Sequence, residues 1–227
     1  MVLIAGFLAV TAVCAGLGVW QLDRLGGKRA ANAIALTARS EPIVMLEGTR
    51  EDSALANRRL RARGHYDHAH DIVVRGRVYR GVPGVEIVSP LVLEGEKTAV
   101  LVNRGFVPSA DAVTVNAGSV REPGLVQVDG IALPIDSGSG TPLRRGNLTT
   151  WSRLDRAALR SSLPYPIHAV YIRQFPDSTL PRFPRRLDPP VLNDGPHLGY
   201  AIQWFAFALI ALVFAGIMAR QGGKGER

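Results

Sequence analysis

The sequence predicts a membrane protein in which an α-helical hairpin carries a β-rich domain on one side of the membrane. Two apolar runs without any charge, 2–22 and 198–219, lie near the two ends of the chain. At 1.5 Å per residue, each run is long enough to cross a bilayer core of about 30 Å as a helix. The polar segment between them holds short runs rich in Val and Ile, separated by Gly and Pro, which is typical of β structure. We therefore expect a transmembrane helix at 1–23, a β-rich domain at 24–197, a second transmembrane helix at 198–219 and a tail at 220–227.

The first helix is expected to end soon after the apolar run. Gly26 and Gly27 come just after its end and predict a break, because glycine weakens a helix interior. The Ala-rich segment 28–39 then predicts a separate short helix, which Pro42 would stop.

The middle of the chain reads as short strands. Residues 59–66 alternate between small or apolar side chains and charged ones, which is the period of a half-solvated strand. Glu94 and Gly95 predict a hairpin turn. Further strands are expected at 72–79, 85–93, 97–103, 125–133 and 167–175. Short antiparallel strands of this kind predict a small barrel or a sandwich.

One helix and one long loop complete the domain. Residues 152–162 predict a short helix, with Ser152 and Asp155 as a capping box. The segment 177–196 holds five prolines and no apolar period, so we expect an irregular connection back to the membrane.

Charge and composition exclude several classes of protein. The net charge is +8, and only Lys28, Lys97 and Lys224 are lysines among the 27 cationic residues. This arginine excess reflects either a GC-rich genome or a surface for lipid head groups and carboxylates. The basic residues are scattered, which argues against nucleic-acid binding. Cys14 is the single cysteine, so the domain has no disulfide and no thiol ligands.

The common catalytic motifs are missing. The sequence has no phosphate-binding glycine loop, no HExxH zinc motif, no GxSxG elbow and no paired cysteines. No set of titratable groups in the β-rich part stands out as an active site. We therefore expect a protein without catalytic turnover.

Three histidines lie close together in the segment HYDHAH. His65, His68 and His70 could bind a metal through their imidazoles. The alternative is a polar turn between two strands, with His65 facing solvent. The absence of a cysteine or a larger carboxylate cluster favours the turn.

A second group of polar and aromatic residues marks the start of the second apolar run. His197, Tyr200 and Trp204 stand at i, i+3 and i+7 and share one helix face. An aromatic belt at the membrane interface accounts for Tyr200 and Trp204. A neutral imidazole such as that of His197 could also ligate heme iron axially.

The first run ends with a matching group. Trp20 and Arg24 share a helix face, and the hairpin places them at the same leaflet as the second group. We expect Trp20, Arg24, His197, Tyr200 and Trp204 to converge on a slot that suits a porphyrin. The rings would cover its faces and Arg24 would bind its propionates. Four small residues would let the two helices approach closely: Ala5, Ala9, Ala12 and Gly16.

Three motifs resemble the Surfeit locus protein 1 family of cytochrome c oxidase assembly factors. LGVWQLDRLGGK at 17–28 resembles the first family signature, and VLVNRGFVP at 100–108, preceded by IVSPLVLEG, resembles the central one. HLGYAIQWFAFA at 197–208 resembles the terminal membrane signature. The motifs stand in the family's order and cover essentially the whole chain. Two departures are Phe106, where the family more often has Trp, and the three-histidine cluster.

The resemblance implies a bacterial plasma-membrane protein with both termini in the cytoplasm and the β domain outside. The literal count of positive charges points the other way, but that rule weakens for long loops. The resemblance also implies a role in maturing an aa3-type oxidase, at heme a insertion into subunit I, with heme a synthase as a further partner. An alternative is a structural accessory subunit of the oxidase that handles no heme. The family's histidine falls on His197, and its Trp-Gln pair falls on Trp20 and Gln21.

The central motif also has a physical interpretation. Arg104 and Gly105 end a strand where the chain must turn. Gly105 is expected to need a backbone conformation closed to other residues. Arg104 is expected to pin that turn or an internal carboxylate rather than to contact a ligand.

Overall fold

The computed structural model describes residues 2–47, 52–136, 138, 140–145 and 148–222. The chain divides into two compact units. The helical unit comprises Met1–Ile34 and Val191–Arg227, and the β unit comprises Ala35–Pro190. The predicted tail at 220–227 lies within the described residues only as far as Gly222.

The first helix does not break at Gly26 and Gly27. Helix α1 runs without interruption over Val2–Ser40. Glycine in a helix interior costs only about 1 kcal/mol per residue, and the residues on both sides are good helix formers. The predicted break is therefore wrong, and the chain leaves the helical conformation just before Pro42, as expected. Helix α3 covers His197–Gly222.

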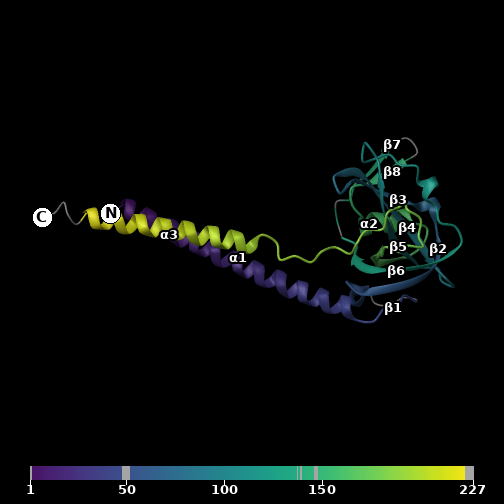
Figure 1. Cartoon of the computed structure of the whole chain (residues 1–227), viewed down its shortest axis with the longest axis horizontal. Helices are drawn as coiled ribbons and strands as arrows, with labels where there is room; N and C mark the ends of the chain where they lie inside the picture. Colours follow the sequence, from purple (N-terminus) through teal and green to yellow (C-terminus); the bar gives the residue numbers. More distant parts are fainter. Residues whose placement is uncertain (1, 48–51, 137, 139, 146–147, 223–227) are drawn as a thin grey trace. The chain divides into compact units, whose positions relative to one another are not determined.

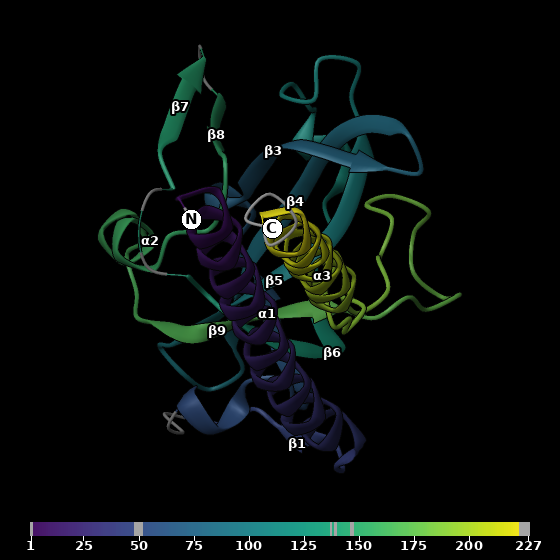
Figure 2. The ribbon, with the colours of Figure 1, turned by 90° about the vertical axis from the view of Figure 1, so that its left-hand side faces the viewer.

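The two helices pack antiparallel and side by side (Figures 1 and 2). Near the chain termini the rings of Phe7 and Phe214 stack with 5.7 Å between centroids. The less exposed residues repeat at alternating steps of three and four, which is the heptad spacing of a coiled-coil seam. On α1 they are Phe7, Thr11, Cys14, Gly18, Gln21, Leu25 and Asn32; on α3 they are Ala201, Trp204, Ala208, Ala211 and Ala215.

Small residues do permit this packing, but not the predicted ones. Ala5, Ala9, Ala12 and Gly16 are exposed and lie outside the seam, so that prediction is wrong. The alanines of α3 are the small residues that face α1. On α1 the close contact is at Gly18, where an added Cβ would lie 2.7 Å from the Phe205 ring.

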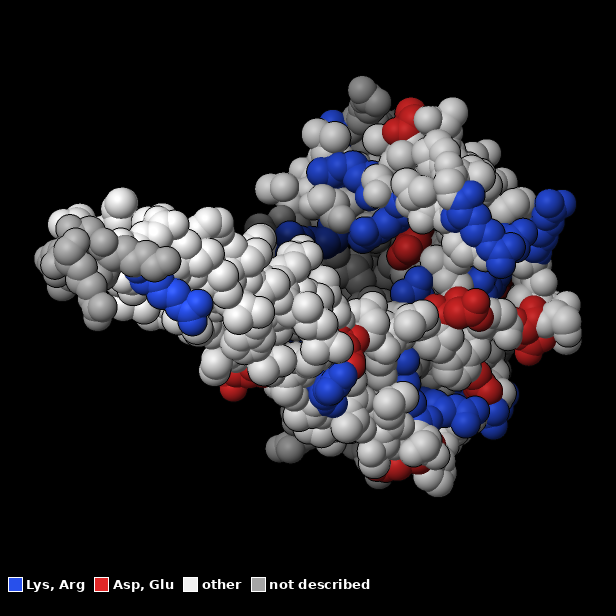
Figure 3. All heavy atoms as spheres, turned by 60° about the vertical axis from the view of Figure 1, so that its left-hand side comes forward, with Lys and Arg blue, Asp and Glu red and all other residues white. Residues whose placement is uncertain are grey.

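The outer surface of the helix pair is apolar. Both helices are long and apolar enough to cross a membrane. Within the most apolar stretch of each helix, only 11% of the residues of α1 and 22% of the residues of α3 are buried. Figure 3 shows this surface as an almost uncharged area, with coloured charges gathered near its ends. An exposed apolar surface of this extent fits a lipid environment.

The β unit is built on a closed five-stranded barrel. The closed order is β2–β6–β9–β5–β4 and back to β2. The pair β5–β9 is parallel, whereas the other barrel pairs are antiparallel. The pairs β1–β2 and β3–β8 outside the barrel are parallel too, so the expectation of antiparallel strands is wrong at these three pairs. The bounds are β1 Val44–Met45, β2 Arg59–Tyr66, β3 Ile72–Tyr79, β4 Val82–Leu93, β5 Ala99–Pro108, β6 Leu125–Pro134, β7 Pro142–Arg145, β8 Leu148–Trp151 and β9 Ile167–Gln174.

Strand β4 closes the barrel because its two halves have different partners. Its first half pairs with β3, and its last residues pair with β2, where Leu93 lies opposite Gly64. A Cβ at Gly64 would lie 2.1 Å from the Val92 carbonyl oxygen. Glycine therefore permits the close approach that closes the barrel.

The predicted strands are present, and most differ from the prediction only by small shifts at their ends. Strand β5, however, continues to Pro108, so the prediction that Arg104 and Gly105 end a strand is wrong: a bulge at Arg104 lets the pairing with β4 continue. The loop at 177–196 contains no helix or strand. The turn at Glu94 and Gly95 is confirmed, with Gly95 at φ +76°. Strands β1, β7 and β8 were not predicted. Helix α2 covers Arg156–Ser162 and starts later than expected. Asp155 is its N-cap and accepts a hydrogen bond from Ala158 N at 3.0 Å, so the capping box with Ser152 is wrong. The described residues of the unit also form three 3₁₀ turns: Asp52–Leu55, His68–His70 and Ala117–Val120.

The barrel interior is apolar along most of its length. Alternate residues of every barrel strand point inward and form the main core, which includes Leu60, Leu91, Val102, Val128 and Ile172. A second core lies between the barrel and α2 around Leu159 and Trp151.

One end of the interior is polar. Arg104 continues the inward series of β5 and is fully buried. Its Nη2 donates to Glu122 Oε1 at 2.6 Å, and Arg186 pairs with the same oxygen. We call this group the polar plug: Tyr66, Ser89, Arg104, Glu122, Gln174 and Arg186. The expectation that Arg104 pins an internal carboxylate is confirmed.

Candidate functional site

The strongest candidate site lies where α3 begins. His197 is the first residue of that helix and is half-buried. Its Nδ1 lies 2.8 Å from Oε1 of Gln21, on the seam of α1. The amide oxygen only accepts, so this bond makes Nδ1 the protonated nitrogen. In the neutral imidazole, the lone pair then lies on Nε2, which is the atom that would ligate a metal centre.

A hollow with a volume of about 390 Å³ lies beside this imidazole, within the helical unit. His197 lines it from α3, and the other lining residues come from α1 at successive turns: Asp23, Arg24, Gly27, Lys28 and Ala31. Gly27 and Ala31 have small side chains, which leaves open space between the charged groups. The hollow therefore combines one imidazole with two cations and one carboxylate.

The predicted aromatic residues are arranged around this hollow only in part. Trp20 is 52% exposed, and the guanidinium carbon of Arg24 lies 5.9 Å from its ring centroid. Tyr200 is 47% exposed, and Trp204 meets Phe207 edge to face. The structure thus brings Arg24 and His197 to one hollow and joins Trp20 to Arg24. Tyr200 and Trp204 are not among the residues that line the hollow.

A polar cluster ties the preceding loop to α1. Asp194 accepts from Arg29 Nε at 2.8 Å and from Asn32 Nδ2 at 3.3 Å. The hydrogen bond from Arg29 is the main reason that the pKa of Asp194 lies below its usual value. Asn32 also donates to the Asn193 carbonyl at 3.0 Å. Together these bonds fix the direction from which the chain enters α3, and hence the position of His197.

Gln21, Asn32 and Asp194 were not predicted as partners of the site. Gln21 and Asn32 lie at the heptad spacing of α1. Polar residues at such positions often face the partner helix, so this spacing is the signal that could have identified them. Asp194 has no such signal, because it lies in an irregular loop.

The three histidines of the HYDHAH segment do not form one cluster. His65 is exposed on β2, as expected for the solvent-facing side of that strand. His68 lies 3.1 Å from Asp71, and His70 lies 2.7 Å from Asp67. Among the described residues, no group of three or more His, Cys, Asp or Glu side chains could hold a metal ion.

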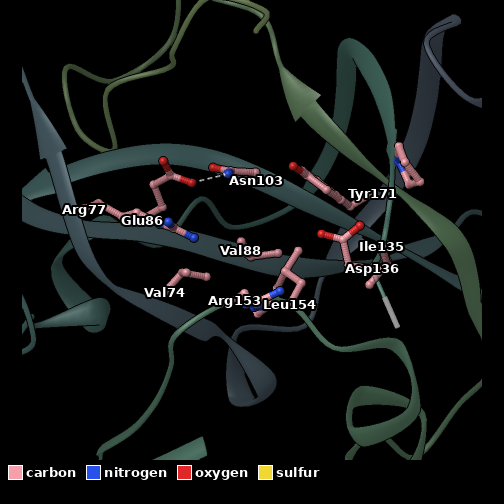
Figure 4. A pocket seen from close by; sticks show the side chains of 11 residues that line it. Val74, Arg77, Glu86, Val88, Asn103, Ile135, Asp136, Arg153, Leu154 and Tyr171 are labelled. Atoms are coloured by element: carbon pink, nitrogen blue, oxygen red, sulfur yellow. Dashed lines mark hydrogen bonds between the residues drawn. The ribbon is translucent and has the colours of Figure 1, made fainter. Parts of the chain in front are cut away.

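The β unit does contain a polar cavity that the sequence did not reveal. Figure 4 shows it between strands β3, β4, β5 and β9, with Glu86 and Asn103 pointing toward each other. Its volume is about 130 Å³, and it is lined by two arginines, Arg77 and Arg153, and two acids, Glu86 and Asp136. The Asn103 amide donates to Glu86 at 2.6 Å. Burial raises the pKa of the Tyr171 phenol beside it. The described lining residues include no Ser, Cys or His.

Comparison with known proteins identifies the family. A model of the SURF1 family matches residues 8–209. The SURF1-like protein of Monosiga brevicollis is 28% identical over 232 residues, which cover 96% of this chain and 87% of that protein. Surfeit locus protein 1 of Rattus norvegicus is 27% identical over 218 residues, covering 87% of this chain and 69% of the rat protein. The mouse protein of the same name is 29% identical over 116 residues, covering 44% of this chain and 38% of its own. The chain therefore belongs to the SURF1 family, which is associated with cytochrome c oxidase assembly.

Proposed function

We propose that this protein is an assembly factor for an aa3-type cytochrome c oxidase that assists the delivery of heme a to subunit I. The observation that carries the proposal is the hydrogen bond between His197 and Gln21 beside a hollow with two cations. A hydrogen bond to the other ring nitrogen of a ligating imidazole orients the ring and selects its tautomer.

The residues at the hollow fit an iron porphyrin with carboxylate side chains as the bound molecule. Nε2 of His197 is the donor atom for iron. Arg24 and Lys28 supply the positive charge that propionates need, and Trp20 supplies an aromatic face beside Arg24. Asp23 lowers the net charge of the hollow, which favours release over tight retention. The protein would thus hold its cargo and pass it on, without catalytic turnover.

The location follows from the same proposal. The chain would cross the bacterial plasma membrane twice, with both termini in the cytoplasm and the β domain on the outer face. Subunit I would receive the heme, and heme a synthase would supply it.

The first test is a visible spectrum of the chain purified from heme a-containing membranes. The parent should show a Soret band, and His197→Ala should lose it. Gln21→Ala should bind heme roughly tenfold more weakly, as is typical when an outer-shell partner of a ligand is removed. His65→Ala and Gln203→Ala are matched controls on exposed positions and should keep the band. A parent protein without a Soret band would contradict heme binding.

The second candidate function is a permanent accessory subunit of the oxidase. It is favoured by the extensive exposed apolar surface of α1 and α3, which needs no ligand to bind a membrane partner. Affinity purification from membranes separates the two functions. Recovery with immature subunit I alone supports the assembly factor, whereas stoichiometric recovery with mature oxidase supports the subunit. Normal heme a content in cells lacking the protein would contradict the assembly role.

A further inference from the structure

A hollow of about 270 Å³ lies on the β unit near the turn between β3 and β4. Its floor and walls are aromatic or apolar, and its rim is basic. We call it the arginine–aromatic hollow and define it by Tyr79, Arg80, Val82, Phe106, Pro108, Arg182, Phe183 and Arg185.

All the charged groups of this hollow are positive. The guanidinium carbons of Arg80 and Arg185 lie 5.4 and 5.7 Å from the Tyr79 ring centroid, and that of Arg182 lies 5.5 Å from the Phe183 ring. No carboxylate is among the lining residues. Within the described part of the chain, none forms an ion pair with these three arginines. Stacking on the rings holds the guanidinium planes in place and leaves their donors for an anion.

Arg80 occupies a backbone position that suits other residues better. It forms a two-residue hairpin loop with Gly81, between the paired residues Tyr79 and Val82. Both loop residues have positive φ, +50° at Arg80 and +80° at Gly81. Asn, Asp and Gly are favoured at such positions. The fold therefore does not explain an arginine here, whereas the electrostatics of the hollow do.

The opposite wall is held in place before any partner arrives. The backbone groups of Arg185 and Phe106 form two hydrogen bonds of 2.8 Å. The Phe106 ring is 2% exposed and packs where Gly84 leaves room for it. Within the hollow, Val82 is 46% exposed. Its side chain provides an apolar contact that is open to a partner.

We propose that the arginine–aromatic hollow binds an acidic segment of a partner protein, with one aromatic or large aliphatic side chain in the hollow and flanking carboxylates on the arginines. Charge complementarity carries the proposal, because an all-positive rim calls for an anion. The size of the hollow matches one side chain, and the exposed Val82 provides an apolar contact for its neighbours. Tyr, Phe and Arg are also the residues enriched at the energetic centres of interfaces. This proposal does not depend on heme a, because it uses none of the residues at His197.

The test measures binding of a fluorescent peptide, Gly-Asp-Glu-Phe-Glu-Asp-Gly, to the full chain in phosphatidylcholine nanodiscs. The parent should bind at low salt and lose affinity as salt rises. The double variant Arg182→Gln/Arg185→Gln should bind roughly tenfold more weakly, at about threefold per exposed charge pair. Arg80→Asn should also bind about threefold more weakly, with no loss of thermal stability because Asn suits the turn. That combination separates binding from folding.

Matched controls make the result decisive. Arg59→Gln removes an arginine that lies 6.0 Å over the Phe175 ring elsewhere on the unit, and it should leave binding unchanged. A peptide with Ala for Phe, or with amides for the carboxylates, should bind at least tenfold more weakly. The proposal is overturned if the Ala peptide binds equally, if Arg59→Gln weakens binding as much as the double variant, or if phosphatidylglycerol vesicles displace the peptide from the hollow.

Discussion

Arg104 illustrates at the scale of single residues how one buried charge is accommodated in a small barrel. Its guanidinium bonds Glu122, the Ser89 hydroxyl and the Val120 carbonyl, and it lies 4.9 Å over the Tyr66 ring. A buried charge is stable only when it is paired and hydrogen-bonded in this way. The sequence predicted a structural role for Arg104, but Glu122 and its second partner Arg186 are distant in sequence and could not be predicted.

Glu122 should make stability pH-dependent. Burial raises the pKa of this carboxyl, but hydrogen bonds and charge from Arg104 and Arg186 outweigh it, so its pKa lies below the usual 4.5. The unfolded chain therefore binds a proton at higher pH than the folded chain, and stability falls as pH drops below about 4.5. Glu122→Gln should lose about 3–5 kcal/mol at neutral pH and show a shallower acid limb in denaturant titrations. The control is Glu94→Gln, which removes a carboxylate from the exposed ion pair with Arg63. It should change the stability at neutral pH and the acid limb only slightly. An unchanged acid limb in Glu122→Gln would contradict the role of Glu122 in the pH dependence.

Gly105 and His197 show what a residue type alone can predict. The backbone at Gly105 has φ +115°, and a Cβ there would lie 2.0 Å from the Arg185 carbonyl oxygen. The expected need for glycine is confirmed, although the segment that approaches it was unknown. The position of His197 at the start of an apolar run is visible in the sequence. Its partner Gln21 required the helix register, and its role with heme a stays a prediction.

At the scale of elements, the helix pair depends on a seam that hydropathy does not reveal. Both runs are apolar all round, so their helical period carries little signal. The predicted small residues were chosen from one face of α1, and the seam uses another. The choice was decided by the residues that α3 presents, above all the alanines between Ala201 and Ala215.

The seam can be tested with two glycines of the same helix. Gly18 lies against the Phe205 ring, whereas nothing lies within 4 Å of a Cβ at Gly16. Gly18→Leu should disturb the pair by about 1–3 kcal/mol through overpacking, and Gly16→Leu should be neutral. Cysteines introduced at Phe7 and Phe214, in a Cys14→Ala background, report the pairing by disulfide yield. The yield should fall in Gly18→Leu only; equal yields in both variants would refute the seam.

Strand elements were predictable where they are long and rich in Val and Ile. The alternation at 59–66 emerges as β2, with alternate residues buried. β1, β7 and β8 have two or four residues each and leave no periodic signal. The parallel pairing of β5 with β9 was also hidden, because it is made by a long connection rather than by a hairpin.

At the scale of the whole molecule, the segment after β9 connects the barrel to α3. It has no regular structure, yet it is anchored to the barrel at several points. Arg186 donates to Gln174 at 3.0 Å and pairs with Glu122, and Arg185 pairs its backbone with Phe106. Farther along, Arg39 donates to the Pro190 carbonyl at 2.9 Å. The polar plug is therefore also the anchor of the connection.

Removing this anchor should expose the connection without unfolding the barrel. Arg186→Gln should lose about 2 kcal/mol of local stability, since hydrogen bonds to charged groups are worth this much. Trypsin should then cleave after Arg182 and Arg185 roughly thirtyfold faster under native conditions. Arg63→Gln, which removes an exposed arginine of β2, is the control. Equal cleavage rates in both variants would show that Arg186 does not hold the segment.

The sequence by itself determined the two apolar helices, the main strands, the glycine turns and the family motifs, because each is encoded in neighbouring residues. The tertiary structure decided which faces meet and which charges pair. The barrel closure at Gly64, the polar plug, the bond between His197 and Gln21 and the arginine–aromatic hollow all join residues far apart in the chain. Such contacts depend on register and on the partner's side chains, which no local pattern contains.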